Sequence, residues 1–145
     1  MSKIIRTVKL PADPQRVIEY ISDVQNHPAF ISPLKSVTGL SGGSHQIGTH
    51  WDWTFLMAGV EIQGRAETVA FEEGRHFSFR TTSGVESTFS YSAEQDGNGS
   101  KFTLQVEYKV PSAVLAKVLD SAIVERQNEA EGDRTAANLK AIFEG

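Results

Sequence analysis

Alternating apolar and polar residues at the start of the chain predict a β-strand that ends at Pro11. Asp13 followed by Pro14 predicts a helix start, because the aspartate can cap free backbone amides and a proline loses nothing in the first turn. Apolar residues then recur at helical spacing for about three turns. A second short helix is expected to start at residues 26–28 and to stop at Pro33.

From residue 34 to residue 110 the pattern changes to a period of two, interrupted by turn residues. The breaks delimit strands near residues 35–40, 46–57, 60–72, 75–82, 85–95 and 101–110. Turns this short join only antiparallel neighbours, since a parallel return needs a crossover of roughly a dozen residues. A change of phase within the third strand of this set predicts a bulge near Thr68. The sheet is therefore expected to be an antiparallel meander.

One face of the predicted sheet is apolar and largely aromatic, so it needs a cover. Residues 113–144 are rich in helix formers and predict one helix of about 30 residues, roughly 45 Å long. Two apolar stripes lie near its ends, formed by Leu115, Leu119, Ala122 and Ile123 and by Leu139, Ile142 and Phe143. The middle of the helix is polar around Gly132, which fits either a bend or a close approach to the sheet.

Length and composition are typical of one globular domain over residues 1–145, with 39% hydrophobic, 9% aromatic and 22% charged residues. The chain has no cysteine, which excludes disulfides, thiolate metal sites and cysteine nucleophiles. A formal net charge of -4 without a run of basic residues argues against nucleic-acid and anionic-membrane partners. No membrane span and no signal-peptide core is recognisable, so a cytoplasmic protein is expected.

The motifs that could carry catalysis are weak. Residues 39–43 match the Gly-x-Ser-x-Gly nucleophile elbow in letters, but a strand follows instead of a helix, so a loop is the preferred interpretation. The histidines, at positions 27, 45, 50 and 76, lack metal-ligand spacing and are interpreted as surface residues. Glu125 and Glu129 could form an acid–base pair, although a solvated helix face is the preferred interpretation. Neither a metal nor a cofactor is expected.

Several segments fit one known arrangement. Residues 9–17 look like its transition from first strand to first helix, residues 22–30 are similar to its second-helix segment, and Gly48, the turn within 93–103 and Leu139-Lys140 also fit. Together with the order of elements, they resemble the START-like (SRPBCC) superfamily over almost the whole chain, in its polyketide cyclase/dehydrase and lipid-transport branch. The resemblance implies an α+β helix-grip fold of order β-α-α-β6-α, in which a seven-stranded antiparallel curved sheet wraps around the C-terminal helix.

In that superfamily the sheet and the long helix enclose a cavity for an apolar ligand, and only a minority of members are established enzymes. The aromatic sheet face therefore has two interpretations, a packed core or a cavity wall. For the cavity wall, the candidate ligand-binding residues are Trp51, Trp53, Phe55, Phe79, Thr81, Phe89, Tyr91, Leu104, Tyr108, Leu119 and Ile123. A covering helix normally keeps its inner face apolar at its centre. The centre of this helix is polar instead, so Arg126, Gln127 or Asn128 is expected to add a polar group to the cavity.

Three classes of function remain. The leading hypothesis is non-catalytic binding of a hydrophobic small molecule, lipid-like or aromatic and polyketide-like, driven by apolar burial. The same pocket could serve a polyketide cyclase, aromatase or dehydratase, in which Tyr91, Tyr108 or a helix residue would move protons. A co-chaperone or adaptor would instead have a compact interior and an exposed apolar patch. The sequence leaves the ligand and the oligomeric state, monomer or homodimer, open.

Overall fold

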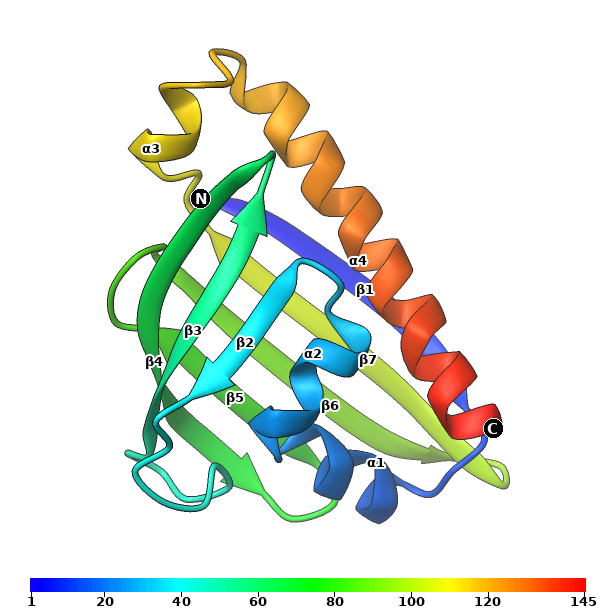
Figure 1. Cartoon of the computed structure of the whole chain (residues 1–145). Coiled ribbons are helices and arrows are strands. Elements are labelled where there is room, and N and C mark those ends of the chain that lie inside the picture. Colours follow the sequence, from blue (N-terminus) through cyan, green and yellow to red (C-terminus); the bar gives the residue numbers. More distant parts are fainter.

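The computed structural model describes residues 1–145 and arranges them as one sheet with helices on its concave side (Figure 1). The strands are β1 (Ser2–Leu10), β2 (Leu34–Thr38), β3 (His50–Met57), β4 (Val60–Glu72), β5 (His76–Thr81), β6 (Ser87–Asp96) and β7 (Gly99–Tyr108). The helical elements are α1 (Pro14–Ile21), the 3₁₀ turn η1 (Val24–Asn26), α2 (His27–Phe30), α3 (Ser112–Leu115) and α4 (Ser121–Glu144). The predicted order is confirmed, with η1 and α3 as additional elements.

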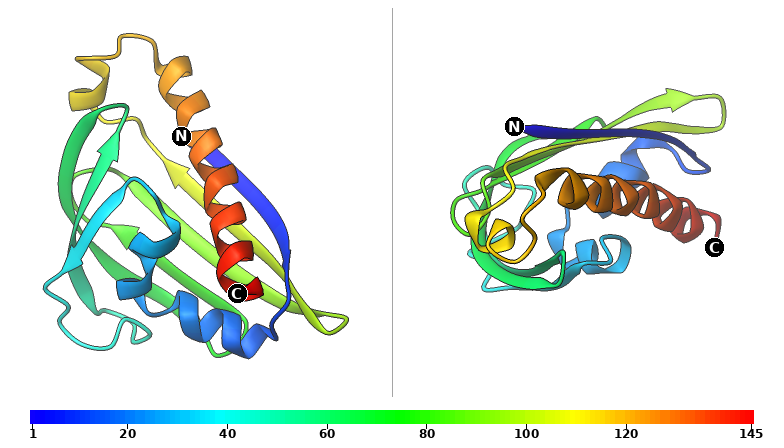
Figure 2. Two further views of the ribbon diagram at one scale, coloured as in Figure 1. Left: turned by 45° about the vertical axis from the view of Figure 1, so that its right-hand side comes forward. Right: turned by 90° about the horizontal axis from the view of Figure 1, so that it is seen from above.

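The sheet is antiparallel throughout, and its strands lie in the order β1-β7-β6-β5-β4-β3-β2. Strands β2 to β7 form the predicted meander, and β1 pairs with β7, so that β1 and β2 are the two edges. The sheet curls around α4, as the view from above shows (Figure 2). The predicted fold, a seven-stranded antiparallel curved sheet around a C-terminal helix, is confirmed.

The predicted bulge in β4 is confirmed, because its pairing with β5 shifts next to Thr68. Residues 39–49 hold this bulge: the Gly48 amide donates to the Thr68 carbonyl at 2.9 Å, and the Thr68 hydroxyl donates to the Ser44 carbonyl at 2.6 Å. These contacts make residues 39–49 a loop. Strand β3 consequently begins at His50, later than its sequence pattern predicts.

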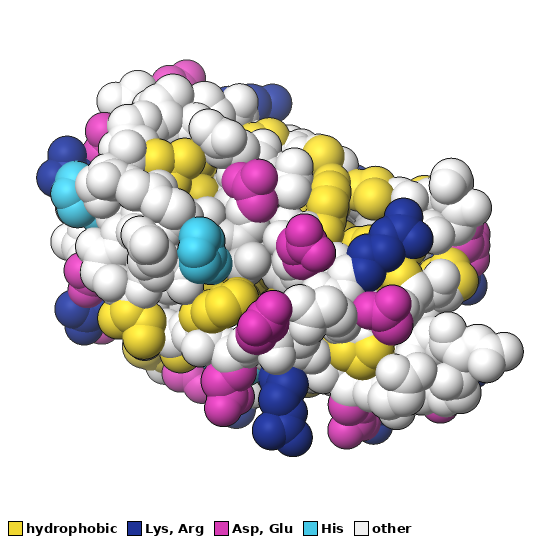
Figure 3. Space-filling model, turned by 90° about the horizontal axis from the view of Figure 1, so that it is seen from below, with side chains coloured by type: hydrophobic (Ala, Val, Ile, Leu, Met, Phe, Trp, Pro, Cys, Tyr) yellow, Lys and Arg dark blue, Asp and Glu magenta, His cyan; other side chains and the backbone are white.

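Helix α1 closes one end of the concave face. It starts where the sequence predicts, but with eight residues it is shorter than the three turns expected. The Asp13 side chain accepts a hydrogen bond from the Arg16 amide at 2.9 Å, and Pro14 occupies the first turn. Val17 and Ile21 are fully buried where α1 lies over β5, β6 and β7. The outer surface at this end shows apolar side chains as separate small patches among charged ones (Figure 3).

The C-terminal segment differs from the prediction of one helix over residues 113–144. Helix α3 is separate, and α4 begins after Asp120, whose side chain accepts a hydrogen bond from the Ala122 amide at 3.0 Å. This N-cap explains the break, because a capping aspartate takes the non-helical conformation that starts a new helix. Helix α4 has 24 residues and is about 36 Å long. None of the helices combines the length and apolar character needed to cross a membrane.

Gly132 marks a close approach between α4 and β1. The helix continues unbroken through this position, and a Cβ atom there would lie 2.8 Å from Ile4 Cγ2. Helix α4 and strand β1 run side by side in all views (Figures 1 and 2). The missing side chain therefore lets the helix lie directly on the edge strand, and of the two interpretations of Gly132 the close approach is correct.

This contact predicts the sign of a mutational effect. Helix propensity alone would make Gly132→Ala stabilising by about 1 kcal/mol. Because the new methyl group overlaps Ile4, we expect Gly132→Ala to lower the free energy of unfolding by about 1 kcal/mol instead. Urea denaturation measures the difference. In an Ile4→Ala background the overlap is gone, and the same substitution should become stabilising; stabilisation in the wild-type background would contradict the contact.

Candidate ligand-binding cavity

The concave sheet face, α4 and the segment from α2 to β2 enclose a cavity of about 120 Å³. Of the 23 residues that line it, 15 are hydrophobic. An engineered apolar cavity of about 150 Å³ holds benzene, whereas pockets for drug-sized ligands measure roughly 300–1,000 Å³. The cavity is therefore of a size that suits about one aromatic ring.

Most of the predicted ligand-binding residues line this cavity: Trp51, Trp53, Phe55, Phe79, Thr81, Phe89, Tyr91, Leu104 and Tyr108. Leu119 and Ile123 do not, and these residues are 89% and 43% exposed. One continuous helix would put both on its inner stripe. In the structure Leu119 lies between α3 and α4, and Ile123 faces outwards in the first turn of α4, so their expected position is wrong.

The aromatic face divides into a packed core and a cavity wall. Phe77 and Phe102 are fully buried outside the cavity, and the Tyr91 ring stacks with both, at centroid distances of 6.4 and 5.9 Å. Phe79 and Phe89 stack with each other at 4.7 Å on the cavity side. Each of the two interpretations of the aromatic face thus applies to a different part of it.

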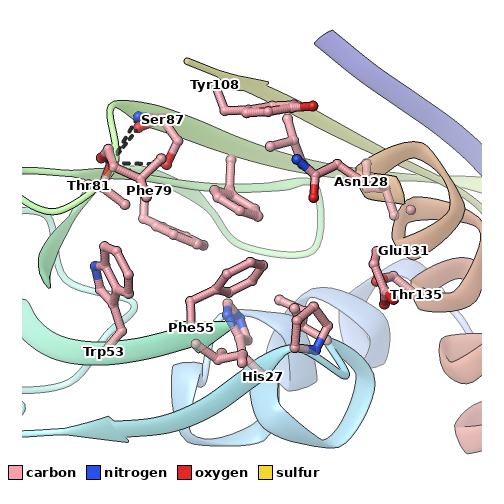
Figure 4. A pocket seen from close by; sticks show the side chains of 18 of the residues that line it. His27, Trp53, Phe55, Phe79, Thr81, Ser87, Tyr108, Asn128, Glu131 and Thr135 are labelled. Carbon is pink, nitrogen blue, oxygen red and sulfur yellow. Dashed lines mark hydrogen bonds between the residues drawn. The ribbon is translucent and has the colours of Figure 1, made fainter. Parts of the chain in front are cut away.

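Four buried side-chain polar atoms lack a hydrogen-bond partner, and three of them belong to cavity-lining residues: Trp53 Nε1, Asn128 Nδ2 and Glu131 Oε2. Trp53 lies at one end of the pocket, and the two α4 residues lie at the other (Figure 4). A buried polar atom without a partner costs about 1–3 kcal/mol. All three atoms are covered by their surroundings, and the Asn128 amide lies next to the Tyr108 hydroxyl (Figure 4).

The polar middle of α4 faces the cavity only in part. Asn128 lines it, as expected for one of three candidates, whereas Arg126 and Gln127 are exposed. Glu131 and Thr135 also line it, and neither was predicted from the sequence. The signal was their spacing, because positions 128, 131 and 135 follow each other at three and four residues and share one helix face.

His27 corrects the interpretation of the histidines as surface residues. This residue is 2% exposed, and its ring centroid lies 5.7 Å from that of Phe79 and 5.8 Å from that of Tyr91. Nε2 lies 2.7 Å from the Ile21 carbonyl oxygen at the end of α1, and because a carbonyl only accepts, Nε2 carries the hydrogen. Burial lowers the pKa of His27 to about 4, so the ring is neutral at neutral pH.

The polar groups predicted on the sheet differ in availability. Burial raises the pKa of the Tyr91 and Tyr108 phenols, so both stay protonated at neutral pH and can serve as hydrogen-bond donors. The Thr81 hydroxyl is already used inside the turn between β5 and β6, where it bonds to the Val85 carbonyl and accepts from the Ser87 amide at 2.9 Å (Figure 4). Thr81 therefore lines the cavity wall, but its hydroxyl group is engaged within the protein.

The other candidate motifs have local structural contacts. Ser41 Oγ accepts a hydrogen bond from the His50 amide at 3.0 Å within a loop, which confirms the loop interpretation of residues 39–43. Glu125 accepts a hydrogen bond from the Ser2 hydroxyl, and Glu129 is exposed. No three histidine, aspartate or glutamate side chains gather in a group that could hold a metal ion.

A curved antiparallel sheet, a long C-terminal helix and an apolar cavity between them define a helix-grip protein of the START-like (SRPBCC) type. The model of the polyketide cyclase / dehydrase and lipid transport family matches residues 1–144. The chain therefore belongs to this family, in agreement with the resemblance of its sequence pattern. No curated protein matches it in sequence.

Solved structures share the fold over nearly the whole chain. The KanY protein is 19% identical with a TM-score of 0.77, over 99% of this chain and 98% of that chain. The Zhui aromatase/cyclase from Streptomyces sp. R1128 is 18% identical with a TM-score of 0.72, over 99% and 92%. TTHA0849 from Thermus thermophilus is 15% identical with a TM-score of 0.71, over 97% and 99%. At these identities the likeness shows a common fold.

Proposed function

We propose that the protein binds a small hydrophobic molecule between the sheet and α4 and does not transform it. The observation that carries the proposal is the cavity with its largely hydrophobic lining. Burial of apolar ligand surface contributes about 25 cal/mol per Å². The size of the cavity favours a ligand with about one aromatic ring.

Three ionisable groups of the wall, His27, Tyr91 and Tyr108, support binding over catalysis. A general base works best with a pKa near the working pH. The pKa of His27, about 4, makes this imidazole a weak base, and the raised pKa values of Tyr91 and Tyr108 keep both phenols protonated. None of the three is therefore tuned to remove a proton from a substrate at neutral pH.

A cyclase, aromatase or dehydratase is the second candidate. The observation in its favour is that His27, whose Nδ1 is an acceptor, adjoins the Tyr91 ring on the wall of the same cavity. Turnover of a carbonyl-rich chain by the wild-type protein, lost in Tyr91→Phe, would support this candidate against binding alone. The co-chaperone or adaptor class predicts a compact interior, which the cavity does not match.

Both tryptophans of the chain, Trp51 and Trp53, lie on the cavity wall, so their signals report its occupancy. We expect toluene, used as a one-ring probe, to shift the indole N–H NMR signals of both residues and to do so saturably. Val106→Phe enlarges a half-buried side chain of the wall and should weaken toluene binding about tenfold or more.

Val60→Phe is the matched control, because Val60 is half-buried in the sheet but does not line the cavity. It should bind toluene like the wild-type protein. Indole signals that do not respond to toluene, or equal affinities of Val106→Phe and the wild type, would contradict binding in this cavity. Mass spectrometry of molecules that copurify with the native protein would then name the natural ligand.

A further inference from the structure

Helix α4 borders the cavity along two seams. One seam lies against β1, and we call it the β1 seam. The other seam faces the loop of residues 31–33, which joins α2 to β2, and the first residues of β2; we call it the β2 seam. The loop lies next to α4 in two views (Figures 1 and 2). A ligand that passes α4 on its way into the cavity has to cross one of these two seams.

The β1 seam is held together by several contacts. The Arg6 guanidinium forms an ion pair with the Asp133 carboxylate and donates a hydrogen bond to the Glu129 carbonyl at 3.2 Å. Gly132 brings the helix backbone directly against Ile4, and both of these residues are buried. Opening this seam would therefore break an ion pair, a hydrogen bond and close packing at the same time.

The β2 seam is fastened by one side chain of α4. Asn138 Nδ2 donates a hydrogen bond to the Phe30 carbonyl at 3.1 Å and lies 3.3 Å from Ser32 Oγ, which can accept a second one. No other hydrogen bond joins α4 to α2, to the loop of residues 31–33 or to β2. Opening this seam therefore breaks fewer polar contacts than opening the β1 seam.

The lining residues at the two seams also differ in burial. Pro33 and Leu34 on one side of the β2 seam, and Asn128 and Glu131 on the other, are only half-buried although all four line the cavity. Ile4, the residue of β1 that lines the cavity, is buried. The cavity thus comes closer to solvent along the β2 seam.

Building on the proposed function, we propose that ligands enter and leave the cavity through the β2 seam and that Asn138 is the latch of this entrance. The β1 seam stays closed and holds α4 to the sheet while the β2 seam opens. Ser32 is exposed, so water can replace the latch contact in the open state. Asn138 does not line the cavity, so its loss should change the rates of ligand exchange and leave the affinity almost unchanged.

NMR exchange measurements on the indole N–H signals, with toluene as the probe, test the latch. Asn138→Leu removes the hydrogen bonds of the β2 seam and should raise the association and dissociation rates of toluene about tenfold each. Arg6→Leu is the matched control, because it removes the polar contacts of the β1 seam and should exchange toluene like the wild-type protein. Wild-type rates in Asn138→Leu, or faster exchange in Arg6→Leu alone, would overturn the proposal.

Reversible cross-links test the route independently of how well Asn138→Leu folds. The chain has no cysteine, so a pair of introduced cysteines reacts alone with a short bifunctional methanethiosulfonate. Ser32→Cys combined with Asn138→Cys places the bridge across the β2 seam, where the two native side chains touch. This bridge should slow toluene release about tenfold or more, and a reductant should restore the wild-type rate. The pair Arg6→Cys and Asp133→Cys bridges the β1 seam and should leave release unchanged.

The outcomes separate the entrance from the proposed function. Toluene that binds in the cavity but leaves at the wild-type rate when the β2 seam is bridged would overturn the entrance and leave cavity binding intact. Release that is slowed only by the bridge across the β1 seam would overturn it in the same way. If toluene does not bind to the wild-type protein, the entrance and the proposed function fail together.

Discussion

Phe102→Ala is expected to lower the free energy of unfolding by about 3–5 kcal/mol, the largest effect of any substitution considered for this protein. The ring is fully buried in β7 and stacks against Tyr91 at 5.9 Å between centroids. Its neighbours are held by β6 and α1, so the structure can close the vacated space only in part. Equilibrium denaturation in urea, with the same m-value for both proteins, measures the loss.

Phe89→Ala is the matched comparison for this prediction. Phe89 is half-buried on the cavity wall, so part of its ring already faces empty space and less packing is lost. We expect its cost to stay below about 2 kcal/mol and the enlarged cavity to accept a bulkier aromatic probe, such as naphthalene. Equal costs for Phe89→Ala and Phe102→Ala would contradict the division of the aromatic face into core and wall.

His27 is expected to make the fold sensitive to acid. Burial holds its folded pKa at about 4, against an ordinary value of 6.5, so between these values the unfolded chain binds a proton that the folded chain does not. Stability from this residue is therefore fully present above pH 6.5 and decreases as the pH falls to about 4. The pKa difference corresponds to a total loss of about 3 kcal/mol.

The variant His27→Gln isolates this contribution, because glutamine does not titrate and keeps an N–H donor for the Ile21 carbonyl. Urea denaturation at a series of pH values should show the wild-type protein losing about 3 kcal/mol more than His27→Gln between neutral pH and pH 4. His45→Gln, at an exposed position, should follow the wild-type curve. Parallel curves for the wild type and His27→Gln would show that protonation of His27 does not destabilise the fold.

The strands and their order could be predicted because the burial of one sheet face produces a local alternation of apolar and polar residues along each strand. Inner residues of β3 and β7, such as Trp51, Trp53, Leu104 and Tyr108, alternate with exposed or half-exposed ones, as their burial shows. The start of α1 was equally local, since Asp13 caps an amide only three residues away. Features that depend on neighbours in the chain were therefore accessible from the sequence.

Features that depend on distant partners were not accessible in the same way. The burial of His27 follows from the free carbonyl of Ile21 and from rings on β5 and β6, none of which marks the histidine in the sequence. The break before α4 was missed for another reason: good helix formers stand on both sides of Asp120 and hide its capping role. That error moved Leu119 and Ile123 into the predicted site.

The irregular edge strand β2 has a consequence for the behaviour of the protein in concentrated solution. An edge strand presents unpaired N–H and C=O groups that can recruit a strand from another molecule. Strand β2 has only five residues, and its pairing with β3 shifts between Leu34 and Ser36. Few of its free backbone groups are therefore aligned for a second strand. This edge of the sheet is therefore a poor template for edge-to-edge aggregation.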